Sequence, residues 1–302
     1  MAIRATILVT SRSSKDEGGT EIDVSSQRTP GTKLLADLLR ASTPLDIVDA
    51  ALVVAAEEYP DLDLDAERHR VQQLGTEAAR RIRDLSNPFA RVDALRHYLY
   101  EELGFRGNND DYYDPRNSFL NEVVDRRTGI PLTLSILYVA IARRAGMDAR
   151  GVGLPGHFVT RIDDGGRRLL VDPFHGGGVI SEEDCRRLVA RATGRPALFR
   201  PEALEGASAT EMLGRLLRNL KRIYLAREDH RRALSAVERL RLVFPNEPTE
   251  LRDRGFLLAH LDLHGAAIDD LETYLSLRPH APDANAVRGR ISWLRRRITE
   301  FN

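Results

Sequence analysis

The chain of 302 residues carries 45 Lys and Arg against 45 Asp and Glu, so its formal net charge is zero. This balance disfavours a general nucleic-acid binder, which needs a basic excess, and leaves room only for a local basic patch. A hydrophobic fraction of 42% with 30% charged residues is typical of a globular protein. The single cysteine, Cys185, excludes an internal disulfide and a cysteine-built metal centre.

No targeting or membrane-spanning segment is predicted. The first ten residues contain only a three-residue apolar run, which is too short for a signal peptide. The longest uncharged stretch, residues 128–142, is too short to cross a bilayer. Together with the single cysteine, these features predict a cytoplasmic protein with no nucleic-acid or membrane partner.

The N-terminal third divides into a tail and a helical lead-in. Residues 1–31 are predicted to be a disordered tail, because residues 11–31 are rich in Ser, Gly, Thr and charge. Apolar spacing and proline stops then predict successive helices up to about Glu102. The polar stretch 104–117 follows without any apolar period and is predicted to be a long loop, a kind of segment that is often functional.

The next segment predicts a buried helix and a small sheet. Apolar residues surround the helix that ends at Gly146, which indicates a central position. Period-two patterns over 150–154, 157–162 and 168–172 then predict three short antiparallel strands. The predicted class is α+β, with a central helix on a small antiparallel sheet and a helical N-terminal lead-in.

Residues 209–302 are predicted to form α-helical repeats. Three positions recur after 34 residues, which is the tetratricopeptide spacing. The paired positions are Tyr224 with Leu258, Ala233 with Ala267, and Pro245 with Pro279. A plain helical bundle with coincident alanines and prolines is the alternative. We take these six residues to define the repeat surface, through which a protein or peptide partner is expected to bind.

Several short motifs resemble the SirB1 family, in which a transglutaminase-like domain precedes tetratricopeptide-like repeats. The matching stretches are residues 117–121, 127–135, 153–158 and 171–174, including Pro155-Gly156-His157-Phe158 and Asp172-Pro173-Phe174. The resemblance covers about residues 33–280 and implies a transglutaminase-like domain over 32–200. It does not settle an activity.

The wider superfamily implies a catalytic cysteine at the start of the central helix, a histidine on the first strand of the facing sheet and an aspartate on the next. His157 and Asp172 match the last two. The cysteine position falls at or very near Pro131, which offers no nucleophile. Cys185 lies beyond Asp172 on another predicted helix. The resemblance therefore implies that the classical thiol mechanism is absent.

Three interpretations of the site stay open. His157 and Asp172 are either a surviving catalytic pair or a structural hydrogen bond. Ser135, one helical turn after Pro131, could replace the thiol, although a serine in an apolar helix more often bonds a carbonyl of the preceding turn. A metal held by His157, Asp172 and His175 has only weak support, so we predict no metal and no cofactor.

The polar loop is either the rim of a cleft near His157 or a solvated surface loop, and it lacks the spacing of an EF-hand calcium site. The residues predicted to line this cleft are Asn117, Pro131, Tyr112, Tyr113 and His175. The preferred function is a non-catalytic, protein- or peptide-binding scaffold or regulatory module. The alternative is a hydrolase or acyl-transfer enzyme that uses His157 and Asp172 with a non-cysteine nucleophile.

Overall fold

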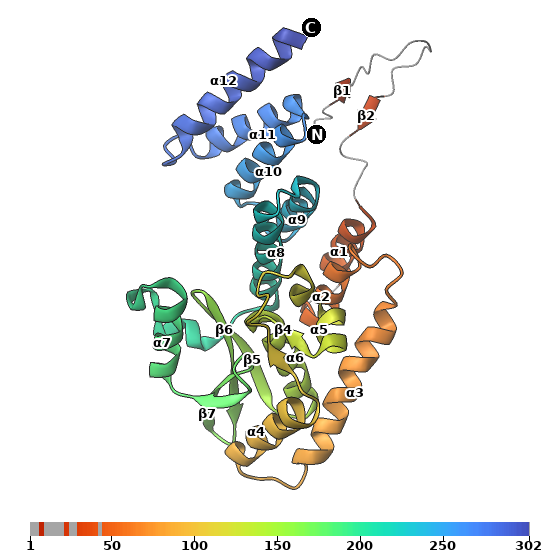
Figure 1. Cartoon of the computed structure of the whole chain (residues 1–302), viewed down its shortest axis with the longest axis vertical. Coiled ribbons are helices and arrows are strands. Elements are labelled where there is room, and N and C mark those ends of the chain that lie inside the picture. Colours follow the sequence, from red (N-terminus) through yellow and green to blue (C-terminus); the bar gives the residue numbers. More distant parts are fainter. Residues whose placement is uncertain (1–5, 9–20, 24–28, 42–43, 302) are drawn as a thin grey trace. The chain divides into compact units, whose positions relative to one another are not determined.

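The computed structural model describes residues 6–8, 21–23, 29–41 and 44–301. The chain divides into two compact units, Asp37–Ile223 and Met1–Ala36 with Tyr224–Asn302 (Figure 1). Most of the tail predicted to be disordered lies outside the described residues. Within it, β1 (Thr6–Leu8) pairs antiparallel with β2 (Glu21–Asp23). The helix α1 (Pro30–Ala41) follows.

The helical lead-in is present, and each of its next three helices begins at a capping side chain. These helices are α2 (Ile47–Ala55), α3 (Leu64–Ile82) and α4 (Pro88–Arg96). Asp46, Asp63 and Asn87 each accept a hydrogen bond from a backbone N–H of the first turn, which would otherwise lack a partner. The helix predicted to reach Glu102 changes at His97, where the π-helical segment η1 (His97–Glu102) continues it.

The central helix is α6 (Pro131–Arg144), and it begins where the sequence predicts. Its residues are buried all round except near its C-terminal end. It follows η2 (Pro115–Ser118), α5 (Leu120–Arg126) and the short parallel pair β3 (Arg106–Gly107) and β4 (Thr128–Gly129). A Cβ on Gly75 of α3 would lie 2.5 Å from the Cβ of Arg144, so only glycine permits the close approach of α3 to α6.

The main sheet is antiparallel, in the order β5-β6-β7-β8. Its strands are β5 (Asp148–Leu154), β6 (His157–Asp164), β7 (Arg167–Asp172) and β8 (Gly178–Ile180). The three predicted strands are confirmed, and so is the hairpin, whose Gly165 and Gly166 both have positive φ. The fourth strand was missed because three residues are too few to show a period.

The sheet is covered on both faces. Val159 of β6 packs with Leu154, Cys185 and Val189 on the face covered by α7 (Glu182–Thr193). Alternation along the strand turns Phe158 to the other face, where α6 packs against β5 and β6. Figure 1 shows α6 and α7 on opposite sides of the sheet.

After α7, two short turns lead into the C-terminal helices. The turns are η3 (Pro196–Leu198) and η4 (Pro201–Glu205). The helices are α8 (Ala209–Ala226), α9 (His230–Val243), α10 (Pro248–His260), α11 (His264–Leu277) and α12 (Ala284–Phe301). The division between the units falls inside α8, after Ile223, whereas the sequence places all of α8 with the repeats. The reason is packing, because a Cβ on Gly151 of β5 would lie 2.8 Å from Met212 of α8.

The predicted repeat surface is mostly an inner surface of the helical array. Tyr224, Ala233, Leu258 and Ala267 are buried, so they pack helices together and do not face a partner. Pro245 and Pro279 are exposed just after the ends of α9 and α11, where they stop the helix. None of the helices in the part of the chain that the structure describes is both long and apolar enough to cross a membrane.

Candidate functional site

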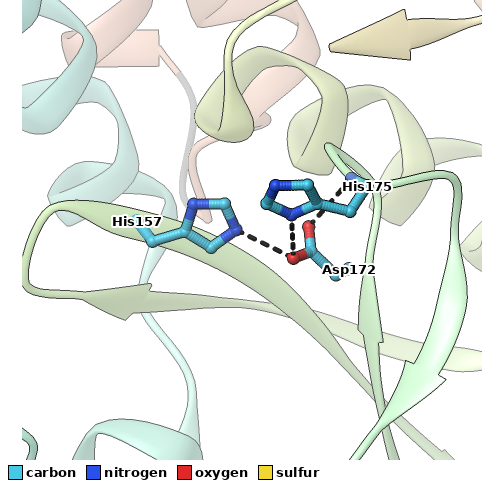
Figure 2. A group of neighbouring side chains, drawn as sticks. All are labelled: His157, Asp172 and His175. Carbon is cyan, nitrogen blue, oxygen red and sulfur yellow. Dashed lines mark hydrogen bonds and ion pairs between the residues drawn. The ribbon is translucent and has the colours of Figure 1, made fainter. Parts of the chain in front are cut away.

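His157, Asp172 and His175 form one hydrogen-bonded cluster (Figure 2). His157 begins β6 and Asp172 ends β7, so the antiparallel sheet brings them together. Asp172 Oδ2 lies 3.0 Å from His157 Nε2 and 2.7 Å from His175 Nδ1. Its Oδ1 accepts the backbone N–H groups of Phe174, at 3.0 Å, and of His175, at 3.3 Å. One carboxylate therefore orients both imidazole rings.

The cluster is buried on one side and open on the other. His157 and Asp172 are buried, whereas the His175 side chain is half exposed. Burial alone would raise the pKa of Asp172, but the hydrogen bonds from His157 and His175 outweigh it and hold this pKa well below its usual range. The hydrogen bond to Asp172 raises the pKa of His175, against burial and the nearby Arg191 charge. The site thus favours an ionised carboxylate beside a protonated His175.

The stability of this cluster is expected to depend on pH. The raised pKa of His175 stabilises the fold fully below its unfolded value of about 6.5, and this contribution is lost as pH rises through the folded value. The lowered pKa of Asp172 stabilises the fold above about 3.9, and that contribution is lost at lower pH. The stability gap between wild type and His175→Gln should therefore be largest between about pH 4 and 6.5. Urea unfolding followed by circular dichroism at pH 5, 7 and 9 checks this, and an equal gap at all three would contradict it.

A cleft of about 560 Å³ borders the cluster. Pro131, Tyr112 and Tyr113 line it together with His157, so the polar loop borders the cleft as one of its two interpretations predicts. Asn117 and His175, which were also predicted to line it, are not among its lining residues. His175 instead lines a smaller pocket of about 180 Å³ together with Asp172.

Asn117 is buried and holds the polar loop in place. Its Nδ2 donates to the carbonyl of Asp111 at 2.8 Å, and its Oδ1 accepts from Asn108 Nδ2 at 3.1 Å. Its own carbonyl accepts from Thr133 Oγ1 at 2.7 Å, which ties the loop to the first turn of α6. Asn117 therefore positions the rim next to Tyr112 without reaching the cleft itself.

The start of α6 supplies no free nucleophile in the described structure. Pro131 is the first residue of the helix and is buried beside the cleft. The hydroxyl of Ser135 is fully buried and lies 3.4 Å from the carbonyl oxygen of Phe158. Among the described residues, no serine or threonine forms a hydrogen bond with His157. Cys185 lies in the core between the sheet and α7, where burial raises the pKa of its thiol to about 12.

The α8 helix provides a wall of the cleft that was not predicted from the sequence. Arg215, Arg218, Asn219 and Arg222 line it. Arg215 Nη2 donates to the carbonyls of Leu154, at 2.5 Å, and His157, at 2.6 Å, across the turn between β5 and β6. The helical spacing of these residues was visible in the sequence, but α8 had been assigned to the repeats.

The three side chains of the cluster are also the right types for a metal site. Their ligand atoms all lie within 4.8 Å of one another. However, the Asp172 Oδ2 atom that would bind an ion is already hydrogen-bonded to both imidazoles. We therefore do not propose a metal here.

Family models match both halves of the chain. A model described as the transglutaminase-like superfamily matches residues 65–218, and a tetratricopeptide-repeat model matches residues 220–292. These matches confirm the predicted order of a transglutaminase-like domain followed by tetratricopeptide repeats. The plain helical bundle is thereby set aside.

Several relatives of the chain are proteins named UPF0162. A UPF0162 protein of Xylella fastidiosa (strain Temecula1) is 36% identical over 252 residues, which cover 82% of this chain and 89% of that protein. A UPF0162 protein of Vibrio cholerae is 28% identical over 251 residues, which cover 83% of this chain and 93% of that protein. Mouse F-box only protein 21 is 33% identical over 108 residues, which are 33% of this chain and 17% of that protein. None of the solved structures matches the chain.

Proposed function

Because this chain belongs to the UPF0162 proteins of the transglutaminase-like superfamily and has Pro131 where the motifs imply a nucleophile, we propose that it is a non-catalytic module that binds protein or peptide partners. Within the family we keep the SirB1 resemblance as part of the proposal. We also propose a cytoplasmic location, which the single buried cysteine supports.

The observation that carries this proposal is a cleft in which proline occupies the position where the family resemblance implies a cysteine. Pro131 and His157 line the same cleft, and proline offers neither a nucleophile nor a backbone N–H. The only thiol of the chain, Cys185, is buried between the sheet and α7. A cleft of about 560 Å³ lies in the size range of ligand sites, so the loss of the thiol leaves a surface suited to binding.

The tetratricopeptide unit adds a second reason to expect a protein partner. Stacked helical repeats form extended surfaces on which peptides and proteins bind. Four of the six residues that recur after 34 positions are buried and used for packing here. We therefore propose that the partner contacts the exposed side chains between these recurring positions.

A second candidate is a hydrolase or acyl-transfer enzyme. The hydrogen bond between His157 and Asp172 favours it, because an aspartate that orients an imidazole prepares a general base. Ser135 is directed at the carbonyl of Phe158, so the attacking group would more readily be a water molecule in the cleft. His157 would take its proton.

One experiment separates these two functions. Wild-type protein and His157→Ala are incubated with a peptide library, and bound peptides are recovered and weighed by mass spectrometry. If the protein is a binding module, wild type should retain peptides whose mass is unchanged. A Tyr112→Ala variant should lose these peptides, because Tyr112 lines the cleft. Cleaved or acyl-modified peptides that appear with wild type and disappear with His157→Ala would overturn the proposal and establish the enzyme.

A further inference from the structure

The cleft beside His157 has an unusual charge for this protein. The whole chain is neutral, yet the described residues that line the cleft include three arginines and neither Asp nor Glu. Arg215, Arg218 and Arg222 follow one another at spacings of three and four, which places them on one face of α8. The cleft therefore carries the local basic patch that the neutral composition left room for.

Two of these arginines lack a carboxylate partner among the residues that the structure describes. Arg215 bonds to two backbone carbonyls and lies over the ring of Phe158. Arg222 donates to Asn219 Oδ1 at 3.2 Å and lies over the ring of Tyr113. Elsewhere in the same unit, arginines pair with acids, as Arg91 does with Asp164 at 2.5 Å. The charges of Arg215 and Arg222 are thus not paired with a carboxylate among the described residues.

Arg215 is held in place before any ligand arrives. The two carbonyl bonds of Arg215 fix its guanidinium against the β5–β6 turn. Burial lowers the pKa of Arg215, the nearby Tyr112 opposes this, and the charge of Arg222 lowers the pKa further. A bound anion would offset the repulsion between the two guanidinium groups. Preorganised guanidinium groups bind carboxylates in two-point contacts without a large cost in side-chain entropy.

The rest of the wall is aromatic and apolar. Tyr112, Phe174, Ile130 and Leu132 line it together with Pro131. The Tyr113 side of the rim is exposed, with 57% of that residue accessible, so the cleft is open at one edge. An open, partly apolar cleft suits a chain segment that enters along it better than a small ion held at one point.

We propose that this cleft binds an acidic segment of a partner protein, with two carboxylates on Arg215 and Arg222 and an apolar residue between them on the aromatic wall. The inference rests on the proposed binding function and names its ligand class. Arg222 follows Arg215 by seven positions of α8, which is about 10 Å along the helix. In an extended polyproline II segment, residues three apart lie on one side about 9 Å from each other. The expected motif is therefore acid-x-x-acid.

The test uses the full chain and a fluorescein-labelled peptide Glu-Pro-Leu-Glu, followed by fluorescence polarisation. Arg222→Gln should weaken binding about tenfold or more, because one charge-assisted contact is lost. Arg83→Gln removes an exposed arginine of the same unit that does not line the cleft and should leave binding unchanged. Arg215→Lys keeps the positive charge but not the two-point contact and should give an intermediate loss.

Comparison ligands decide between outcomes. Gln-Pro-Leu-Gln should bind at least tenfold more weakly than the acidic peptide, and inorganic phosphate should compete poorly. Equal binding of both peptides, or no binding of the acidic one at about 1 mM, would overturn the acidic ligand class. In the first case the proposed binding function would still stand. Tighter binding of a single-stranded oligonucleotide would also overturn the inference, whereas turnover of any peptide would overturn the proposed function itself.

Discussion

A cysteine placed at position 131 should become a reactive thiol, while the native Cys185 should remain almost inert. Position 131 is the first residue of α6 and lines the cleft with His157. A helix N-terminus and a neighbouring imidazole both lower the pKa of a thiol. Cys185 is fully buried, and its pKa is raised to about 12. Its thiolate fraction near neutral pH is therefore on the order of 1000-fold below that of a free thiol.

The measurement is the rate of alkylation by iodoacetamide at pH 7, followed by mass spectrometry. The double variant Pro131→Cys with Cys185→Ser should react at least about 100-fold faster than wild type. Adding His157→Ala to it should slow the reaction, because the imidazole partner of the thiolate is removed. Cys185→Ser alone gives the background, and unfolded wild type in guanidinium gives the rate of a free thiol. Rapid alkylation of native wild type would show that Cys185 is accessible and would contradict its burial.

Asp172→Ala should destabilise the unit Asp37–Ile223, which contains the main sheet, by about 3 kcal/mol. The substitution removes a carboxylate that accepts several buried hydrogen bonds. The carboxylate accepts from His157, His175 and two backbone N–H groups and is 3% exposed. Alanine leaves these donors without their partner, and the burial of His157 keeps water from replacing the carboxylate fully. By contrast, Asp110→Ala changes an exposed loop carboxylate and should alter stability by less than about 0.5 kcal/mol.

Hydrogen exchange is the measurement for this variant. Tryptophan fluorescence would report on the other unit, because Trp293, the only tryptophan, lies in α12 within Tyr224–Asn302. Peptides covering β6 and β7 should exchange about 100-fold faster in Asp172→Ala than in wild type when exchange follows unfolding of the unit. Peptides from α10 and α11 act as an internal reference. Unchanged protection of β6 and β7 would mean that the carboxylate does not hold the strands together.

The local features of this protein were determined by its sequence. Pro131 fixes the start of α6, since proline suits the first helical position. The pair Gly165-Gly166 fixes the hairpin, and the matching places of His157 and Asp172 identified the cluster. The 34-residue recurrence identified the repeats that the family model confirms. The helix start, the hairpin and the repeats depend on residues close together in the chain or on a period that the chain itself displays, whereas the roles of His157 and Asp172 were implied by the resemblance of the motifs to a known family.

Only the tertiary structure showed which distant residues meet. Arg215 lies 58 residues after His157 and yet bonds to its carbonyl, because α8 packs on the sheet. Asn117 looked like a cleft residue but is buried beneath the loop, where its amide satisfies backbone groups. Alanines that recur with the repeat period proved to be contacts between helices. The pattern of side chains along a helix or strand shows which of its faces is apolar. It does not show which other element packs against that face, because that depends on contacts between residues far apart in the chain.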